Sequence, residues 1–337
     1  MNADLDTGYS VIIPVYNVAA YLRECLDSVL RQDLPAAQII AVDDGSTDES
    51  GQILEEYARV HPVIQVIHQA NQGVGAARNA GLGLARGQFV GFVDPDDFIL
   101  PSFFRDLAAA VVAGDLDIAI ANGRRLYPDG ATAEIYPVPL PEGIVGGQEW
   151  YAKALRTRDY GHYVYLMLMR RSWLVAHALH FPADRIHEDV MWTTVAMLRA
   201  RRVQYHHHDQ AYRYRQRPGS LVSARTDWEI ARQVSSLLAN NVDCIAILKT
   251  ESLLPSLRDA LLDATVNGNH HIAHRAEIIG DPKLRYTAMR AVLAAGTLSQ
   301  LWRYRVSRRR WGLFKKLVKF SMAVSLGAVR GDGRTVC

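Results

Sequence analysis

Residues 88–97 of the chain are Gln88-Phe89-Val90-Gly91-Phe92-Val93-Asp94-Pro95-Asp96-Asp97, an apolar run followed directly by a group of carboxylates. An apolar run of this length next to turn residues predicts a buried β-strand. In open α/β sheets, ligands bind beyond the carboxyl ends of the strands. The stretch therefore predicts a strand of the central sheet with a ligand site at its end.

Strands and helices alternate on both sides of this stretch. Short apolar runs predict strands over residues 9–14, 38–43, 63–68 and 117–121. Apolar or small residues at helical spacing predict helices over residues 18–31, 47–60 and 75–86. Such alternation produces parallel strands joined by right-handed crossovers. We therefore predict an α/β fold, with a Rossmann-like, mostly parallel sheet flanked by helices.

The alternation weakens after about residue 122. Several prolines indicate an irregular or β-rich stretch, followed by a helix over 188–199 and short strands over 203–205 and 211–215. From Thr226 onward, Leu, Ala and Arg recur at helical spacing. We expect two domains: residues 1–222, which contain the sheet, and a mainly helical region over residues 223–337.

Composition is that of an ordinary globular protein, with 49% hydrophobic and 22% charged residues in 337. The three cysteines, Cys25, Cys244 and Cys337, are far apart and have no zinc-binding spacing. We interpret them as free thiols in a reducing compartment. The first ten residues lack the pattern of a signal peptide, and no stretch of about 18 apolar residues occurs. We expect a cytoplasmic protein.

The acidic residues after the strand at 88–93 are candidates for a metal site. Asp94 and Asp96 offer the hard oxygen ligands that Mg²⁺ or Mn²⁺ prefers, and phosphate oxygens of a substrate can complete the coordination. The simpler interpretation is a turn that caps the helix after Pro101. We favour the metal site because several acidic positions share this sheet edge.

Two other segments are predicted to lie at the same edge. Asp43 and Asp44 end the strand at 38–43 and can accept hydrogen bonds from a uracil-type N–H or a ribose hydroxyl, although an ordinary Asx turn is the alternative. Arg78 lies in a helix that begins with small residues, where it can meet a phosphate. The glycines before it do not form a complete dinucleotide-binding fingerprint.

Later in the chain, Glu188 and Asp189 begin a helix, and we interpret one of them as a general base facing an acceptor. Simple charge complementarity with the helix dipole is the alternative. Arg217 and Ser220 follow a basic and aromatic stretch and can close over a diphosphate. The alternative there is a solvated charged strand and turn.

Taken together, these segments resemble the bacterial family 2 glycosyltransferases of GT-A fold. The likeness covers about residues 8–112. It rests on an opening segment at 10–17, an Asp-Asp-Gly-Ser segment at 42–50, and a third stretch from Asn71 through Ala80-Gly81 to Asp97. The Gln-x-x-Arg-Trp signature of processive, membrane-embedded synthases does not occur. The resemblance therefore implies a non-processive enzyme that adds one sugar per encounter.

The resemblance also implies roles for individual residues. Pro14, Tyr16 and one or both of Asp43 and Asp44 would hold the nucleotide base, and Arg78 would lie near the base or diphosphate. Asp94 would contact the ribose or the metal, and Asp96 would bind Mn²⁺ or Mg²⁺. Asp189, or else Glu188, would be the base. Family members invert at the anomeric carbon, so an α-linked UDP-sugar would give a β-linked product in surface or extracellular polysaccharide synthesis.

The C-terminal region is strongly basic. Residues 301–337 contain ten Lys or Arg and a single acid, Asp332, interleaved with aromatic and aliphatic residues. A basic amphipathic helix with aromatics suits an anionic membrane surface, whereas a terminal helix packed on the body is the simpler interpretation. We expect residues 301–330 to bind the inner leaflet, which suggests a lipid-linked oligosaccharide or another glycan as acceptor. No recognition motif for nucleic acid accompanies the charge.

Two rival functions are also compatible with parts of this sequence. One is another nucleotide-sugar-processing enzyme, such as a pyrophosphorylase, or an NAD-dependent oxidoreductase. Against these, the turn after the first strand, residues 14–17, lacks a glycine-rich phosphate loop. The other rival is a membrane-associated scaffold that has the fold without turnover.

Overall fold

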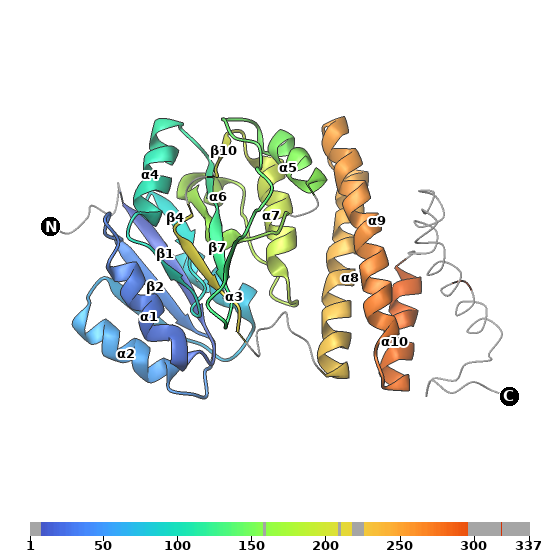
Figure 1. Cartoon of the computed structure of the whole chain (residues 1–337), viewed down its shortest axis with the longest axis horizontal. Helices are drawn as coiled ribbons and strands as arrows, with labels where there is room; N and C mark the ends of the chain where they lie inside the picture. Colours follow the sequence, from blue (N-terminus) through green and yellow to red (C-terminus); the bar gives the residue numbers. More distant parts are fainter. Residues whose placement is uncertain (1–7, 158–159, 208–209, 218–225, 296–317, 319–337) are drawn as a thin grey trace. The chain divides into compact units, whose positions relative to one another are not determined.

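The computed structural model describes residues 8–157, 160–207, 210–217, 226–295 and Val318. The chain divides into two compact units, which are residues 1–184 with 188–217, and residues 185–187 with 218–337 (Figure 1). The first unit contains both sheets, and the described part of the second is helical.

A seven-stranded sheet forms the centre of the first unit, in the order β10-β6-β9-β4-β1-β2-β3. Its strands pair in parallel except β9, which runs antiparallel to both β4 and β6. Every residue of β1, β2 and β4 is buried, which explains their mostly apolar sequence. The strands are β1 (Tyr9–Val15), β2 (Gln38–Asp43), β3 (Ile64–His68), β4 (Phe89–Phe92), β6 (Ile118–Ala121), β9 (Met167–Arg170) and β10 (Val203–His206).

The strand order determines the face of the sheet on which each of the first helices lies. The crossovers from β1 to β2 to β3 move one way along the sheet and the crossover to β4 returns, so right-handed connections place α1 and α2 on one face and α3 on the other. The helices are α1 (Ala19–Leu30), α2 (Ser50–Val60), α3 (Val74–Leu84), α4 (Phe103–Ala113), α5 (Gly147–Arg156), α6 (Arg171–Ala176) and α7 (Glu188–Arg199), with a 3₁₀ turn at Val164–Leu166.

A second, four-stranded sheet has the order β5-β11-β7-β8. Its strands are β5 (Phe98–Ile99), β7 (Gly123–Leu126), β8 (Thr132–Glu134) and β11 (Tyr212–Arg215). Because β5 directly follows the acidic residues 94–97, its antiparallel pairing with β11 brings β11 beside them. The stretch predicted to be irregular or β-rich contains β7 and β8, together with the helices α5 and α6.

The second unit consists, in its described part, of α8 (Asp227–Thr250), α9 (Pro255–Glu277) and α10 (Pro282–Ala294). Thr226 and Glu229 form a capping box that begins α8, and buried residues such as Val234, Ile272 and Val292 form an apolar cluster. Among the described helices, none is both long and apolar enough to cross a membrane. Apart from Val318, the basic tail at 301–330 lies outside the described residues.

The predicted fold class is confirmed. The chain has a mixed α/β core with a mostly parallel sheet flanked by helices, and its C-terminal part is helical. The strands predicted at 9–14, 38–43, 63–68 and 117–121 correspond to β1, β2, β3 and β6.

Candidate functional site

The acidic stretch, residues 94–97, leaves the carboxyl end of β4 and is held by β11. Asp97 is almost completely buried. Its Oδ2 accepts a hydrogen bond from the Tyr212 hydroxyl at 2.9 Å, and its Oδ1 accepts one from the Arg215 backbone N–H at 2.8 Å. Burial, together with the charges of Asp96 and Asp94, raises the pKa of Asp97 well above its usual value. Asp97 therefore fixes the turn that carries Asp94 and Asp96.

Arg78 connects this stretch to the start of α7. Its side chain is only 6% exposed; Nη2 donates to Asp94 Oδ1 at 2.8 Å, and Nη1 pairs with the Glu188 carboxylate. Asp94 comes from the end of β4, and Glu188 is the first residue of α7. One guanidinium thus brings together two carboxylates that are far apart in the sequence.

The helix α3 can place Arg78 between Asp94 and Glu188 because its first turn packs closely against the backbone at Pro182. A Cβ atom at Gly75 would lie 2.3 Å from the carbonyl oxygen of Pro182, so no larger residue fits without a shift of the backbone. The ring of Phe181 lies 5.4 Å from the Arg78 guanidinium carbon and stacks on Trp192 of α7, with 4.8 Å between ring centroids. These contacts hold α3, Arg78 and α7 in register.

Glu188 and Asp189, adjacent at the start of α7, have different environments. Glu188 is buried and paired with Arg78. Asp189 is partly buried, and no side-chain ion pair involves it among the described residues. Burial and the nearby charge of Glu188 raise the pKa of Asp189 well above its usual value, even though Arg78 lowers it. A carboxylate with a raised pKa and no committed partner suits a general base.

Asp96 of the acidic stretch contacts two arginines, Arg215 at the end of β11 and Arg217 just after it. Arg217 Nε donates to Asp96 Oδ2 at 2.6 Å, and Arg215 Nε donates to the Asp96 backbone oxygen at 3.1 Å. Arg215 also pairs with Glu24 of α1 at 2.6 Å. The basic and aromatic stretch therefore lies on the acidic one, with its positive charge directed at Asp96.

Asp94 and Asp96 fit a divalent cation whose remaining ligands come from the substrate. Among the described residues, no group of three or more His, Cys, Asp or Glu side chains is arranged to hold a metal. Asp94 and Asp96 nevertheless each have one carboxylate oxygen without a hydrogen bond in the described part of the chain. One or two carboxylates plus phosphate oxygens are a usual Mg²⁺ environment. The donor set is therefore sufficient when a diphosphate completes it.

At the end of β2, Asp43 and Asp44 are both buried and hydrogen-bonded. Asp44 accepts from Gln69 Nε2 at 2.7 Å and from the backbone N–H groups of Gln72 and Gly73 at 2.9 and 2.8 Å. Gly73 precedes α3, so Asp44 anchors the loop that leads to Arg78. Asp43 accepts from the Ser46 N–H at 2.9 Å and lies 2.9 Å from His68 Nδ1.

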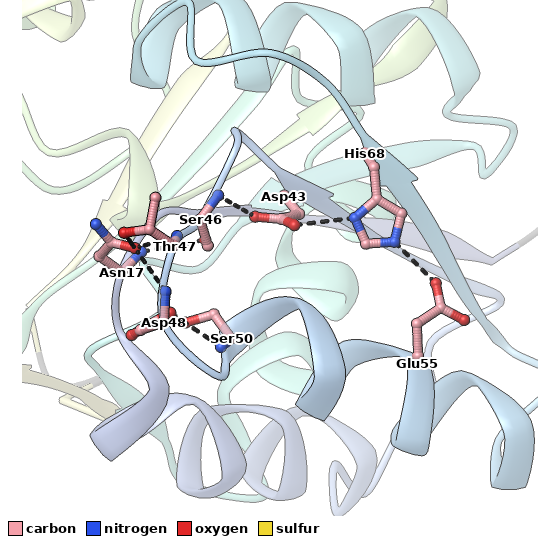
Figure 2. A network of polar contacts seen from close by, with 8 residues as sticks. All are labelled: Asn17, Asp43, Ser46, Thr47, Asp48, Ser50, Glu55 and His68. Carbon is pink, nitrogen blue, oxygen red and sulfur yellow. Dashed lines mark hydrogen bonds and ion pairs between the residues drawn. The ribbon is translucent and has the colours of Figure 1, made fainter.

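The loops after β1 and β2 are joined to each other (Figure 2). Asn17 has a positive φ of 50°, and its side-chain oxygen accepts from the Thr47 N–H at 2.7 Å. The Asp48 carboxylate in turn accepts from the Ala19 N–H at 3.0 Å. These contacts hold the segment directly after Tyr16, a residue that is 46% exposed just beyond the end of β1. An exposed aromatic ring at this edge can stack on a nucleotide base.

The sequence-derived candidates are placed as follows. Arg78, Asp94 and Glu188 are in direct contact, Asp189 adjoins Glu188, and Arg217 contacts Asp96. Pro14 is buried within β1, opposite Val42 of β2. Ser220 lies outside the described residues.

Two contributing residues, Tyr212 and His68, were not singled out as candidates. In the sequence, Tyr212 belongs to a basic and aromatic stretch, and His68 is the last residue of a predicted strand. Alternating aromatic and basic residues at 212–215 were a usable signal, because alternation in a strand places the aromatic side chains on one face. Nothing in the sequence near His68 indicated its two carboxylate partners.

Comparison with known proteins places this geometry in context. Residues 10–173 match the family model described as glycosyl transferase family 2. The uncharacterized glycosyltransferase YibD of Escherichia coli (strain K12) is 36% identical over 199 residues, which are 58% of this chain and 58% of that protein. The poly(ribitol-phosphate) beta-N-acetylglucosaminyltransferase TarS of Staphylococcus aureus is 28% identical over 242 residues, 69% of this chain and 40% of TarS. The matched part thus spans less than two thirds of these curated relatives.

Solved structures share the fold. Residues 1–349 of S. aureus TarS, in complex with UDP-GlcNAc, superpose with a TM-score of 0.56 and 22% identity, covering 90% of this chain and 93% of that one. The mannosyltransferase PcManGT of Pyrobaculum calidifontis, in complex with GDP-Man and Mn²⁺, gives a TM-score of 0.56 and 16% identity, covering 94% and 87%.

Proposed function

Because the chain belongs to glycosyl transferase family 2, we propose that it transfers a sugar from a nucleotide-sugar donor, a UDP-sugar, to a hydroxyl of a glycan acceptor in bacterial polysaccharide synthesis. The observation that carries this proposal is the contact of buried Arg78 with both Asp94 and Glu188. It sets the uncommitted carboxylate of Asp189 beside the acidic stretch, so a base and a diphosphate-binding region adjoin one another.

In the proposed reaction, the acceptor hydroxyl oxygen attacks the anomeric carbon of the donor, and Asp189 takes the hydroxyl proton. The bond between that carbon and the diphosphate oxygen breaks, and its electron pair leaves with UDP. Attack from the face opposite the leaving group inverts the configuration, so an α-linked donor gives a β-linked product. Glu188, held by Arg78, keeps the start of α7 in place.

The leaving diphosphate accumulates negative charge, which the site must offset. Asp94 and Asp96 would hold Mn²⁺ or Mg²⁺, and this ion would supply positive charge to the diphosphate. Arg217, which contacts Asp96 through Nε, would bind the same phosphates with its guanidinium when the donor is present. Asp43 and the exposed ring of Tyr16 would hold the base.

The proposed function is tested by measuring nucleotide release from UDP-, GDP- and dTDP-sugars with Mn²⁺ present. We expect release from a UDP-sugar and its loss in Asp189→Asn. NMR of the product would establish the anomeric configuration. If the protein binds a nucleotide but turns over none of the donors with any acceptor tried, the result would favour a non-catalytic scaffold instead.

We further propose that residues 1–222 form the transferase domain and that residues 223–337 end in a membrane-binding tail, which would place the enzyme at the inner leaflet near a lipid-linked acceptor. The support is the charge of residues 301–337, with ten Lys or Arg and one acid. Flotation with anionic and neutral liposomes tests this. Equal recovery of the full chain and of a form ending at residue 300 would reject it.

A further inference from the structure

His68 is the last residue of β3, and two carboxylates contact its ring (Figure 2). Nδ1 lies 2.9 Å from Asp43 Oδ2, and Nε2 lies 2.9 Å from Glu55 Oε1. Asp43 comes from the neighbouring strand, where it is directly paired with His68, and Glu55 comes from α2. Three consecutive elements of the sheet edge therefore meet at one imidazole.

The two contacts favour the charged form of the ring. A neutral imidazole has one N–H donor and one acceptor nitrogen, whereas an ionised carboxylate only accepts. In either neutral tautomer, one ring nitrogen would direct its lone pair at a carboxylate. Only the imidazolium donates to both. Consistent with this, the bonds to Glu55 and Asp43 raise the pKa of His68.

Asp43 is held at both of its oxygens. Oδ1 accepts the Ser46 N–H, Oδ2 faces His68, and the carboxylate side chain is only 8% exposed. Although burial raises the pKa of Asp43, the bonds from Ser46 and His68 lower it overall. Each oxygen retains a further lone pair. The carboxylate is thus kept ionised, in one orientation, and with accepting capacity left.

The helix α2 packs tightly against this pair. A Cβ atom at Gly51 would lie 3.0 Å from Asp43 Oδ2 and 3.7 Å from His68 Cε1. Glycine at this position of α2 lets the helix approach the pair, and Glu55, one turn later, reaches the far nitrogen of the ring. The charged groups that face His68 are therefore Asp43 from β2 and Glu55 from α2.

We propose that His68, held between Asp43 and Glu55, is a positioning residue that orients the Asp43 carboxylate to accept the base N–H of the donor nucleotide. The inference rests on the proposed function, in which Asp43 contacts the base. Uracil, thymine and guanine present a ring N–H to such an acceptor, and cytosine does not. His68 therefore acts on nucleotide affinity and base selectivity, and not on the transfer step.

The test measures the affinity for UDP by calorimetry between pH 5.5 and 8.5, without acceptor or turnover. The variants are His68→Ala, His68→Asn and Glu55→Gln. Glu56→Gln is the matched control, because Glu56 lies on the same helix but pairs with exposed Arg23 at 2.6 Å. Ratios of variant to wild-type affinity at each pH cancel the titration of UDP itself.

We expect His68→Ala to weaken UDP binding roughly tenfold at pH 6, with a smaller effect at pH 8.5. His68→Asn keeps an N–H donor for Asp43 and should recover much of the affinity without the pH dependence. Glu55→Gln should lower the pH at which the His68 ring resonances titrate by NMR, and the affinity profile should shift by the same amount. Glu56→Gln should follow the wild type.

Two failures are distinguishable. If Asp43→Asn binds UDP as tightly as the wild type, the proposed contact of Asp43 with the base is wrong. If Asp43→Asn weakens binding but His68→Ala has wild-type affinity at every pH, the positioning role of His68 is wrong. Should His68→Ala fail to fold, Glu55→Gln decides, because an affinity profile that stays unshifted while the His68 resonances move would overturn the inference.

Discussion

Arg78 Nη2 lies 2.8 Å from Asp94 Oδ1, and the same guanidinium pairs with Glu188. A single buried cation is thereby shared by the carboxyl end of β4 and the first residue of α7. Its two partners are buried or nearly so, with exposed side-chain fractions of 22% for Asp94 and 5% for Glu188. Asp94 and Glu188 therefore share Arg78 as their counter-charge, whereas Asp96 pairs with Arg217.

Replacing Arg78 by methionine should therefore be strongly destabilising. The substitution keeps much of the side-chain volume but leaves two carboxylates without their cation, and breaking a buried pair costs about 3–5 kcal/mol. Urea unfolding would measure the loss, and it should be partly recovered in Arg78→Met combined with Glu188→Gln.

The matched control is Arg23→Met, which breaks an exposed pair with Glu56 in which both side chains are more than half exposed. Exposed pairs of this kind contribute little to stability, so the loss should be much smaller than for Arg78→Met. Equal losses for Arg78→Met and Arg23→Met would contradict the central role of Arg78.

Asp189→Asn should remove the proposed base and leave the fold and UDP affinity unchanged. We expect kcat to fall by roughly 10²–10⁴-fold, the usual contribution of a general base. The pKa of Asp189 is raised, and a base must be deprotonated to act, so the wild-type rate should fall with decreasing pH well above the pH expected for an ordinary aspartate. A pH–rate profile measures this limb, and an unchanged kcat in the variant would transfer the role to another residue.

Much of the fold could be predicted from local sequence, because buried parallel strands are continuous apolar runs and their helices have a regular apolar spacing. The strand β9 could not be placed. Its apolar sequence, Met167–Arg170, says nothing about which neighbours it joins, and it inserts antiparallel between β4 and β6. Tertiary pairing, which local patterns do not encode, decides such a position.

The candidate site was predictable in its acidic positions and less so in its contacts. Carboxylates at strand ends predict a ligand-binding edge of the sheet. The partner of Arg78 on α7, Glu188, is 110 residues away in sequence, so no local pattern indicates this pair. The choice between Glu188 and Asp189 stayed open for the same reason, since only the structure distinguishes the paired carboxylate from the uncommitted one.

Substitutions at Asp96 and Arg217 should separate metal binding from diphosphate binding. We expect a chelator to stop UDP-sugar turnover and added Mn²⁺ to restore it, and Asp96→Ala to weaken Mn²⁺ binding roughly tenfold or more.

Arg217→Ala should instead bind Mn²⁺ alone at least as tightly as the wild type, because the guanidinium no longer occupies Asp96 Oδ2. Its affinity for UDP should decrease. Electron paramagnetic resonance titration of Mn²⁺ and calorimetry of UDP measure the two effects, and parallel losses in both variants would argue against this division of roles.

Asp97→Asn should make the protein's stability less dependent on pH. Burial and the charges of Asp96 and Asp94 raise the pKa of Asp97, so the folded chain holds a proton that the unfolded chain releases at lower pH. Stability that depends on this proton is present below the unfolded pKa and is lost as pH rises towards the folded pKa, at up to about 1.4 kcal/mol per pH unit.

The asparagine keeps an oxygen for the Arg215 N–H and an amide that can donate to the Tyr212 hydroxyl, so the turn should survive. Urea unfolding at several pH values from 4 to 8 should therefore show a shallower decline in the variant than in the wild type. A variant whose free energy of unfolding falls with pH as steeply as that of the wild type would show that Asp97 is ionised in the folded protein, with Tyr212 and Arg215 sufficient to stabilise its charge.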